Sequence, residues 1–471
     1  MLSYLGWQIL REQDLKDMVA FTEMVFLFRF LPVFLAVYYI TPKKYRNTTL
    51  LFGSILFYAA GEPHFVLLLL MAVWLNYWLA GKIDCYKNGN EGKENCNKWI
   101  WAAMVLDVGL LAVFKLLGVW LGNSVLPLGL SFYLFKMISF QLDVYRGEIK
   151  PLPTFKRTAV YFIMFPQIVS GPIMRFREGS FLLEEREYSL EKVEEGLQYF
   201  VLGLGTKVLL ADRLAILWKD IQVIGYESIS TPLAWLGAVG YSMELYFDFW
   251  GYSMMASGLC VMLGFPFIKN FDHPYASKSV SEFWRRWHMT LGSFFRDYVY
   301  IPLGGSREGT KKTVRNLLVV WLLTGFWHGG SLNFIFWGLL LFLLIVCEKL
   351  WLGKWLKEYP WLGNVYVLLL IPITWVFFAI TDLGQLGLYL SRMFPFWGGG
   401  IAVNTKDIWK YLQMYWVYLT VGAIWCVPAV YRFWEKHRKH VVSVVWTAVI
   451  FWLSVYSVVS MGNNPFAYLK F

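Results

Sequence analysis

Two apolar runs flank a histidine and two glycines in RNLLVVWLLTGFWHGGSLNFIFWGLLLFLLIVCEK, residues 315–349. Each run approaches the roughly 20 apolar residues that a helix needs to cross a bilayer. The short segment between them, residues 328–331, carries no Lys or Arg. The stretch therefore predicts two membrane-spanning helices that meet at a turn, with one ionisable ring, His328, at that turn.

Apolar runs of this kind recur from Met24 to the end of the chain. The 471 residues are 58% hydrophobic and only 16% charged, whereas soluble proteins contain about 25% charged residues. We therefore predict an all-α, polytopic integral membrane protein with a single membrane domain over residues 1–471, in which residues 1–20 form an interfacial segment at most. The predicted spans are about 24–41, 49–61, 64–81, 99–118, 125–142, 157–171, 195–211, 232–256, 314–328, 331–347, 362–380, 409–431 and 441–460.

The formal net charge of +11 lies in short loops between apolar runs, not on a separate polar domain. This distribution is typical of the positive-inside rule, so it predicts a lipid bilayer as the partner and no nucleic acid. The basic loops, assigned to the cytoplasm, are 41–47, 82–98, 146–157, 296–315, 349–357 and 432–440. Loops 61–64, 121–124, 328–331 and 462–465 are assigned to the other side.

The topology gives His328 a depth in the membrane. Arg315 marks the cytoplasmic start of its helix, and 13 residues at 1.5 Å each carry the chain roughly 20 Å from that surface. The following run returns to Lys349 on the inside. We therefore expect His328 in the extracytoplasmic half of a multi-pass protein of the cell membrane.

The segment SVSEFWRRWHMTLGSFFRDYVYIPL, residues 279–303, differs from the spans. Ser279 and Glu282 match a capping box at a helix start, and apolar residues then recur every three or four positions. We predict one amphipathic helix at the cytoplasmic interface, with His288 at the border of its apolar stripe. The apolar stripe consists of Val280, Trp284, Trp287, Leu291, Phe294 and Tyr298. The polar side carries Arg285, Arg286 and Arg296.

His328 has two interpretations. An imidazole at a helix end is often structural and bonds a nearby carbonyl, but ionisable groups inside membranes are rare and usually functional. The glycines after it allow close approach of a backbone or ligand, and a neutral imidazole can take a proton from an alcohol. For His288 the structural interpretation is stronger, because amphipathic interfacial helices often contain a histidine at their edge.

Glu244 and Asp248 are four residues apart within an apolar run and share a helix face. Two such carboxylates need a cation to be ionised together, so we interpret them first as structural polar contacts. Arg29, Lys115, Lys136 and Lys207 are the candidate cations, and the sequence does not match them to a partner. The five cysteines lack close paired spacing, so neither a disulfide framework nor a metal site is predicted.

Long motifs identify the chain as similar to a known family. YFDFWGYSMMASG (246–258), NFDHPYASKSVSEFWRRWHMTLGSFFRDYVYIPLGGSR (270–307) and RNLLVVWLLTGFWHGGSLNFIFWG (315–338) resemble the membrane-bound O-acyltransferase (MBOAT) family, as do VSGPIMRF (169–176) and NNPFAYLKF (463–471). IPLGGSR (301–307) is closest to the bacterial branch of alginate O-acetyltransferases. Met254 stands where that branch commonly has Asp. An apolar residue at this position is more similar to the teichoic acid D-alanyl transferases.

The resemblance implies a fold and a site. It implies a ring of about 11–13 tilted spans with interfacial or re-entrant helices around a thin, funnelled centre, and a catalytic core at about 165–350. His328 of the WHG motif and His288 of the FWRRWH motif are the implied catalytic residues, with His288 toward the cytoplasmic side. Supporting or substrate-tunnel roles are predicted for Trp287, Trp327, Asn270, Asp248, Arg285 and Asn333.

The function predicted from this resemblance is transfer of an acyl group, most simply acetyl, across the membrane to a hydroxyl. The donor would be a cytoplasmic thioester such as acetyl-CoA or an acyl carrier protein, used as substrate with no bound cofactor. The acceptor would be an exported polysaccharide or an extracytoplasmic relay protein of the SGNH type. Two alternatives remain open: D-alanyl transfer to teichoic acid from a carrier protein, and a secondary transporter or flippase.

Overall fold

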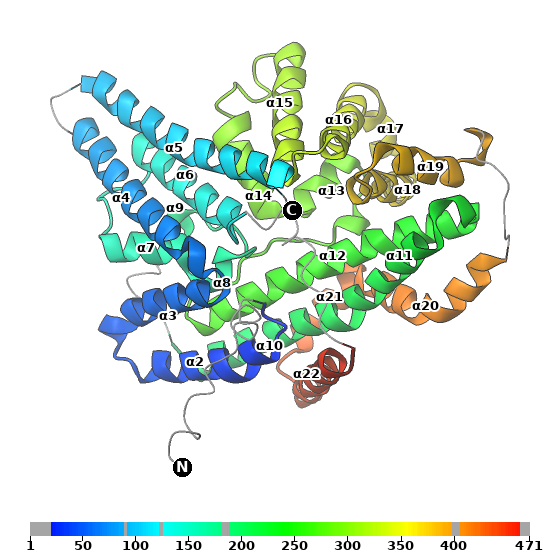
Figure 1. Ribbon diagram of the computed structural model, residues 1–471, viewed down its shortest axis with the longest axis horizontal. Coiled ribbons are helices and arrows are strands. Elements are labelled where there is room, and N and C mark those ends of the chain that lie inside the picture. Colours follow the sequence, from blue (N-terminus) through cyan, green and yellow to red (C-terminus); the bar gives the residue numbers. More distant parts are fainter. Residues whose placement is uncertain are drawn as a thin grey trace. The chain divides into compact units, whose positions relative to one another are not determined.

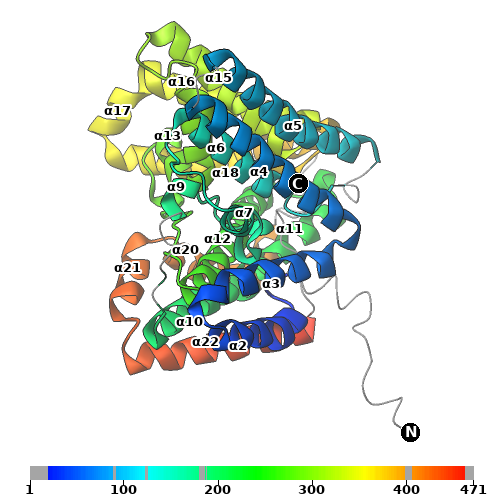
Figure 2. The same cartoon turned by 90° about the vertical axis from the view of Figure 1, so that its left-hand side faces the viewer.

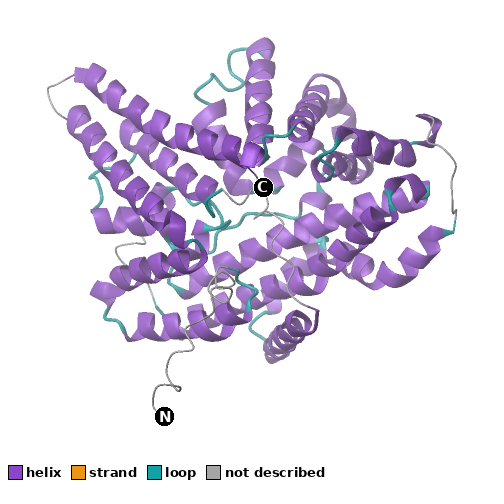
Figure 3. Ribbon diagram, viewed as in Figure 1, coloured by secondary structure: helices purple, strands orange, loops and turns teal. Residues whose placement is uncertain are grey.

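The computed structural model describes residues 20–88, 92–121, 126–179, 186, 188–397 and 406–461. Within these ranges the chain consists of helices and loops without a strand (Figure 3). The prediction of an all-α protein is therefore confirmed. The predictions for residues 1–19, for most of loop 121–124 and for the terminal stretch 462–471 lie outside the described residues.

Several helices are long and apolar enough to cross a membrane, which confirms a multi-pass protein. Within the described ranges these segments are Pro63–Cys85, Glu94–Gly118, Leu332–Glu358, Pro360–Ala379 and Val441–Ser460, and a sixth forms if the pair Asp407–Trp425 and Pro428–His437, bent by 73°, is one broken span. Helices also occupy the other predicted spans, but each of them is too short, too polar or too highly charged to count as a membrane-spanning helix by itself. Span 157–171, for example, is broken at Met164 into two short helices.

The chain divides into two compact units, each of which is discontinuous in sequence. The first comprises Met1–Phe200, Tyr252–Ile268 and Val455–Lys470. Its longest helices, α4, α5 and α6, pack against one another (Figure 1). The helices that lie wholly in this unit are α2 (Leu31–Ile40), α3 (Arg46–Gly61), α4 (Val66–Asn88), α5 (Gly92–Leu121), α6 (Leu130–Arg146), α7 (Phe155–Ile163), α8 (Phe165–Ile168) and α9 (Phe176–Gly179).

The second unit comprises Val201–Gly251 and Lys269–Ser454, and it contains both candidate histidines. Helices α10 (Leu190–Gly205), α12 (Thr231–Met262) and α22 (Val441–Met461) contribute residues to both units. The remaining helices of the second unit are α11 (Asp212–Ile224), α13 (Val280–Arg286), α14 (Met289–Phe295), α15 (Thr310–His328), α16 (Leu332–Cys347), α17 (Gly353–Glu358), α18 (Pro360–Ala379), α19 (Leu383–Met393), α20 (Asp407–Trp425) and α21 (Pro428–His437).

Helices α15 and α16 form the hairpin predicted from the opening stretch. They pack closely because a Cβ atom on Gly325 would lie 2.5 Å from the backbone oxygen of Phe334, and one on Gly338 would lie 2.5 Å from that of Trp321. Small residues permit this approach between membrane helices, where packing replaces the hydrophobic effect as the driving force. Helix α16 in turn packs against α18. These three helices carry the surroundings of His328.

Candidate active site at the ends of α15 and α18

His328 is the last residue of α15, and α16 begins at Leu332 after a three-residue turn. The predicted position at a helix-to-helix turn is therefore confirmed. The side chain is buried, with 3% of its surface exposed. Its neighbour Gly329 has extended backbone and packs so close to the Phe334 ring that a Cβ atom there would clash with it.

Aromatic rings enclose the imidazole of His328. The ring centroid of Trp327 lies 4.4 Å away, and those of Trp337 and Phe378 each lie 5.1 Å away in edge-to-face geometry. Trp337 is fully buried and stacks on Trp375 at 5.8 Å. Such surroundings exclude water, which strengthens electrostatic interactions of a charge that develops there.

Asn333 anchors one wall of this enclosure. It is fully buried, and its Nδ2 donates to the backbone oxygens of Phe377 at 3.1 Å and Phe378 at 3.3 Å. Its Oδ1 accepts a hydrogen bond from Ser331 at 2.6 Å. Asn333 therefore joins the turn after His328 to the end of α18, where the Phe378 ring faces the imidazole.

His288 lies at a break in the segment predicted as one amphipathic helix. The prediction of a continuous helix over 279–303 is wrong: α13 ends at Arg286, and His288 adopts a left-handed conformation with φ of 43° before α14 begins. The predicted helix start at Ser279 is confirmed, since Ser279 Oγ accepts from the backbone N–H of Glu282 at 3.0 Å, whereas the Glu282 carboxylate accepts from the backbone N–H of Lys278 at 2.9 Å. The predicted stripe is also buried, with Trp284 half-buried.

Asn270 explains the break. Its Oδ1 accepts hydrogen bonds from the backbone N–H of Thr290 at 3.2 Å and from the Thr290 hydroxyl at 2.9 Å, and it lies 3.1 Å from Nδ1 of His288. Its backbone oxygen accepts from the N–H of Met289 at 2.8 Å. These bonds replace part of the helical hydrogen bonding that residues 287–290 would otherwise make.

The same contacts set the tautomer of His288. Because the backbone N–H of Thr290 can only donate, the atom of Asn270 that meets it is the acceptor, Oδ1. Nδ1 of His288 must then donate to that oxygen, so the neutral ring carries its proton on Nδ1 and its lone pair on Nε2. Burial lowers the pKa of His288 to about 3, so the ring is neutral at physiological pH.

The two histidines meet at one indole. The ring centroid of Trp327 lies 6.4 Å from His288 and 4.4 Å from His328. The ring of Phe249 packs edge-to-face on that of His288, with the two centroids 4.6 Å apart. The fold thus brings together four of the residues singled out in the sequence: Asn270, His288, Trp327 and His328.

Two further candidates lie farther from this cluster. Trp287 is buried and contacts Trp375 at 4.9 Å, so it extends the aromatic wall. The Arg285 side chain is exposed. Sequence reasoning did not single out Trp337, Trp375, Phe378 or Thr290; Trp337 lies in the opening motif, but nothing in the sequence links residues 375–378 to His328.

Asp248 belongs to a buried group of charges. Nζ of Lys207 lies 2.7 Å from the carboxylate of Asp248 and 2.5 Å from that of Asp212. Of the four candidate cations, Lys207 is therefore the partner of Asp248. It is buried, with 2% of its surface exposed. By contrast, Lys136 donates to Gln167 at 2.7 Å and to the backbone oxygen of Tyr161 at 3.1 Å.

The family model of the membrane-bound O-acyltransferases matches residues 55–381, more than half of the chain and the whole of the described site. The chain belongs to the membrane-bound O-acyltransferase family. It is therefore an acyltransferase held in a lipid bilayer, and the family predicted from the motifs is confirmed. The site residues have not been tested by these comparisons and stay predictions.

Relatives of this MBOAT protein are named for acyl transfer to alginate, peptidoglycan and teichoic acid. It is 37% identical to the probable alginate O-acetylase AlgI of Pseudomonas fluorescens, over 80% of this chain and 76% of the relative. It is 30% identical to the peptidoglycan O-acetyltransferase of Helicobacter pylori, over 83% of each. Identity to the teichoic acid D-alanyltransferase of Bacillus subtilis is 28%, over 64% of this chain and 78% of the relative.

Proposed function

We propose that this MBOAT protein transfers an acetyl group from a cytoplasmic thioester to a hydroxyl on the other side of the cell membrane, at the site formed by His288, Trp327 and His328. The observation that carries the proposal is the contact of both imidazoles with one buried indole. Acyl transfer between two substrates is accelerated when one site holds both in the reacting geometry. The higher identity to O-acetylases than to D-alanyl transferases favours acetyl as the acyl group.

In this mechanism His328 is the general base. Its imidazole takes the proton of the acceptor hydroxyl while the hydroxyl oxygen attacks the thioester carbonyl carbon. When the carbon–sulfur bond breaks, the leaving sulfur takes the proton back from the imidazolium, so the ring returns to its neutral form. The donor, acetyl-CoA or an acyl carrier thioester, is a substrate, and the step needs no bound cofactor.

His288 has a different role in the proposal. Because Asn270 holds its proton on Nδ1, the ring offers Nε2 as an acceptor. A neutral, fixed acceptor orients an O–H or N–H group of a substrate without competing for its proton. Asn270 is therefore a positioning residue that acts through His288, and Asn333 is a positioning residue for the enclosure of His328.

The acceptor is an exported polysaccharide or an extracytoplasmic protein of the SGNH type that completes the transfer. The proposed orientation places His328 toward the extracytoplasmic half and His288 toward the cytoplasmic side. Charge supports this orientation, because Arg315 begins the run to His328 and the 296–315 loop is basic.

Substitution of His328 by Ala tests the proposal. General-base catalysis contributes roughly 100- to 10,000-fold in rate, so we expect surface acetyl esters to fall by that factor, measured by mass spectrometry in a gene-deletion strain that expresses each variant. The matched control is His64→Ala, at an exposed position in the short 3-10 helix Pro63–Phe65. Acetylation at the wild-type level by His328→Ala would refute the assignment of the base. If the gene is needed for alanyl esters and not for acetyl esters, the transferred acyl group is D-alanyl and not acetyl.

A further inference from the structure

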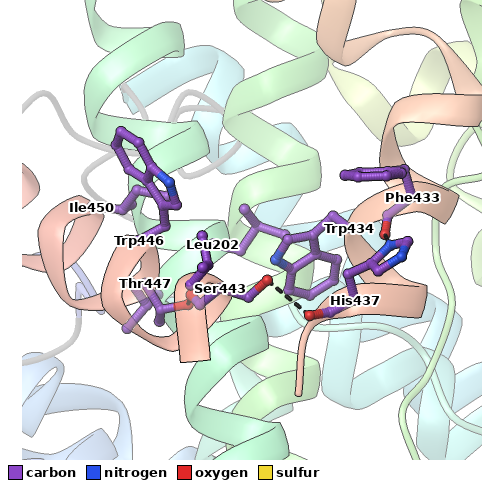
Figure 4. Close-up of a pocket in the computed structure, with 10 residues that line it drawn as sticks. Leu202, Phe433, Trp434, His437, Ser443, Trp446, Thr447 and Ile450 are labelled. Carbon is purple, nitrogen blue, oxygen red and sulfur yellow. Dashed lines mark hydrogen bonds between the residues drawn. The ribbon is translucent and has the colours of Figure 1, made fainter. Parts of the chain in front are cut away.

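The second unit contains a groove whose lining includes neither His288 nor His328. It has a volume of about 290 Å³ and runs between α21, the first turns of α22 and residues 201–202 of α10 (Figure 4). The lining includes Leu202, Phe433, Trp434, His437, Trp446 and Ile450. Figure 2 shows α21 and α22 in orange and red, joined by a tight turn.

Three polar side chains in the groove, Ser443, Thr447 and His437, contact backbone oxygens. Oγ of Ser443 donates to the backbone oxygen of His437 at 2.8 Å, and Oγ1 of Thr447 donates to the backbone oxygen of Ser443 at 2.8 Å. Nδ1 of His437 is 2.8 Å from the backbone oxygen of Phe433, and Figure 4 shows the two contacts of His437 as dashed lines. The walls therefore offer apolar and aromatic surface, which suits a hydrocarbon chain.

The groove opens toward the bilayer. Helix α22 carries a span of 20 residues with a mean hydropathy of 2.0, of which only 17% is buried inside the protein. On this helix Val442 is 67% and Trp446 60% exposed. The lining residues 442–450 cover about 12 Å along the helix axis, so the groove extends from the membrane interface into the hydrocarbon region.

The interfacial end of the groove is basic. The segment 432–440, RFWEKHRKH, contains Arg432, Lys436, Arg438 and Lys439 against a single Glu435, and Lys436 and Lys439 are exposed. This segment is a predicted cytoplasmic loop. Basic clusters directly beside a membrane helix attract anionic lipid headgroups, with about 1 kcal/mol for each Lys or Arg.

We propose that this groove is a binding site for an anionic phospholipid, with part of one acyl chain between α21 and α22 and the phosphate at the basic turn 436–440. The volume of about 290 Å³ is at the lower end of roughly 300–1,000 Å³ for small-molecule sites, so it holds a segment of one chain and not a whole lipid. Charge at the turn then selects among lipids with the same chains. The site is independent of the acyl transfer proposed above.

Native mass spectrometry of the purified full-length chain tests the proposal, with phosphatidylglycerol and phosphatidylcholine of identical acyl chains as probes. We expect the wild-type protein to bind phosphatidylglycerol more tightly. In the variant Lys436→Gln/Lys439→Gln this preference should fall by about 25-fold, since each lysine contributes about fivefold. The matched control Lys354→Gln/Lys357→Gln removes two exposed charges from α17, in another basic segment, and should keep the preference.

Leu202→Trp tests the apolar part, because the larger ring fills the groove from the α10 side. It should weaken binding of both lipids, whereas Leu343→Trp, on the exposed face of α16, should not. If the two double lysine variants lose the preference for phosphatidylglycerol equally, the preference comes from the overall charge of the protein, and the proposed site is wrong. Unchanged binding in Leu202→Trp, or displacement of the lipid by excess inorganic phosphate, would show that no acyl chain lies in the groove.

Discussion

Substitution of Asn270 separates a positioning role from a structural one. In Asn270→Ala the hydrogen bonds from His288 and from the two donors of Thr290 are lost. A neutral hydrogen bond contributes about 1 kcal/mol, so the loss of tautomer control alone predicts at least about a fivefold slower acyl transfer. The matched control is Asn364→Ala, which removes bonds to the backbone oxygens of Ala276 and Ser277 in the same segment without touching His288.

Asn270→Asp gives a sharper readout, because a carboxylate keeps the acceptor geometry and adds a charge. Burial holds the pKa of His288 at about 3 in the wild type, and an opposite charge within hydrogen-bonding distance raises a pKa by about 1–3 units. The pKa in the variant should therefore be about 4–6. The imidazole is neutral above its pKa, so transfer should be lost as pH falls through this range.

The assay is acetyl transfer to envelope material in membrane vesicles, followed from pH 4 to 8 with equal amounts of each variant. The wild-type protein should show no acid limb from His288 in most of this range, whereas Asn270→Asp should show one. Identical pH profiles for these two proteins, together with full activity of Asn270→Ala, would refute the tautomer argument. Loss of activity in Asn364→Ala equal to that in Asn270→Ala would assign the effect to the fold of the segment.

Three further changes test the surroundings of the site. Lys207→Ala leaves the buried carboxylate of Asp248 and the partly buried one of Asp212 without their cation, so unfolding in detergent should become easier by roughly 3–5 kcal/mol, measured by chemical denaturation; an unchanged midpoint would contradict the ion pair of Lys207 and Asp248. Gly325→Ala places a Cβ 2.5 Å from a backbone oxygen of α16 and should cost about 1–3 kcal/mol in the same measurement, whereas Gly387→Ala, with open space around it, should not. Trp327→Leu removes the ring between the two histidines and should slow acyl transfer while the protein stays folded, by circular dichroism and gel filtration; full activity would show that the shared indole is dispensable.

Much of this protein was predictable from local pattern. Apolar runs near 20 residues long can hardly be anything but membrane helices, because the bilayer core admits no unpaired backbone. The turn at His328 followed from the charge-free segment between two such runs, and the cap at Ser279 from neighbours three residues apart. These features depend on residues close in sequence.

The site itself was decided by tertiary contacts. Periodicity predicted a continuous helix through His288, and the break arises because Asn270, 18 residues earlier, bonds to the turn. The sequence offered four cations for Asp248, and packing selected Lys207. Phe378 lies against His328 because α16 packs on α18, where Asn333 bonds to the backbone oxygen of Phe378. Helix propensity and hydropathy act over a few turns of chain, whereas the satisfaction of buried polar groups depends on partners that only the folded packing brings together.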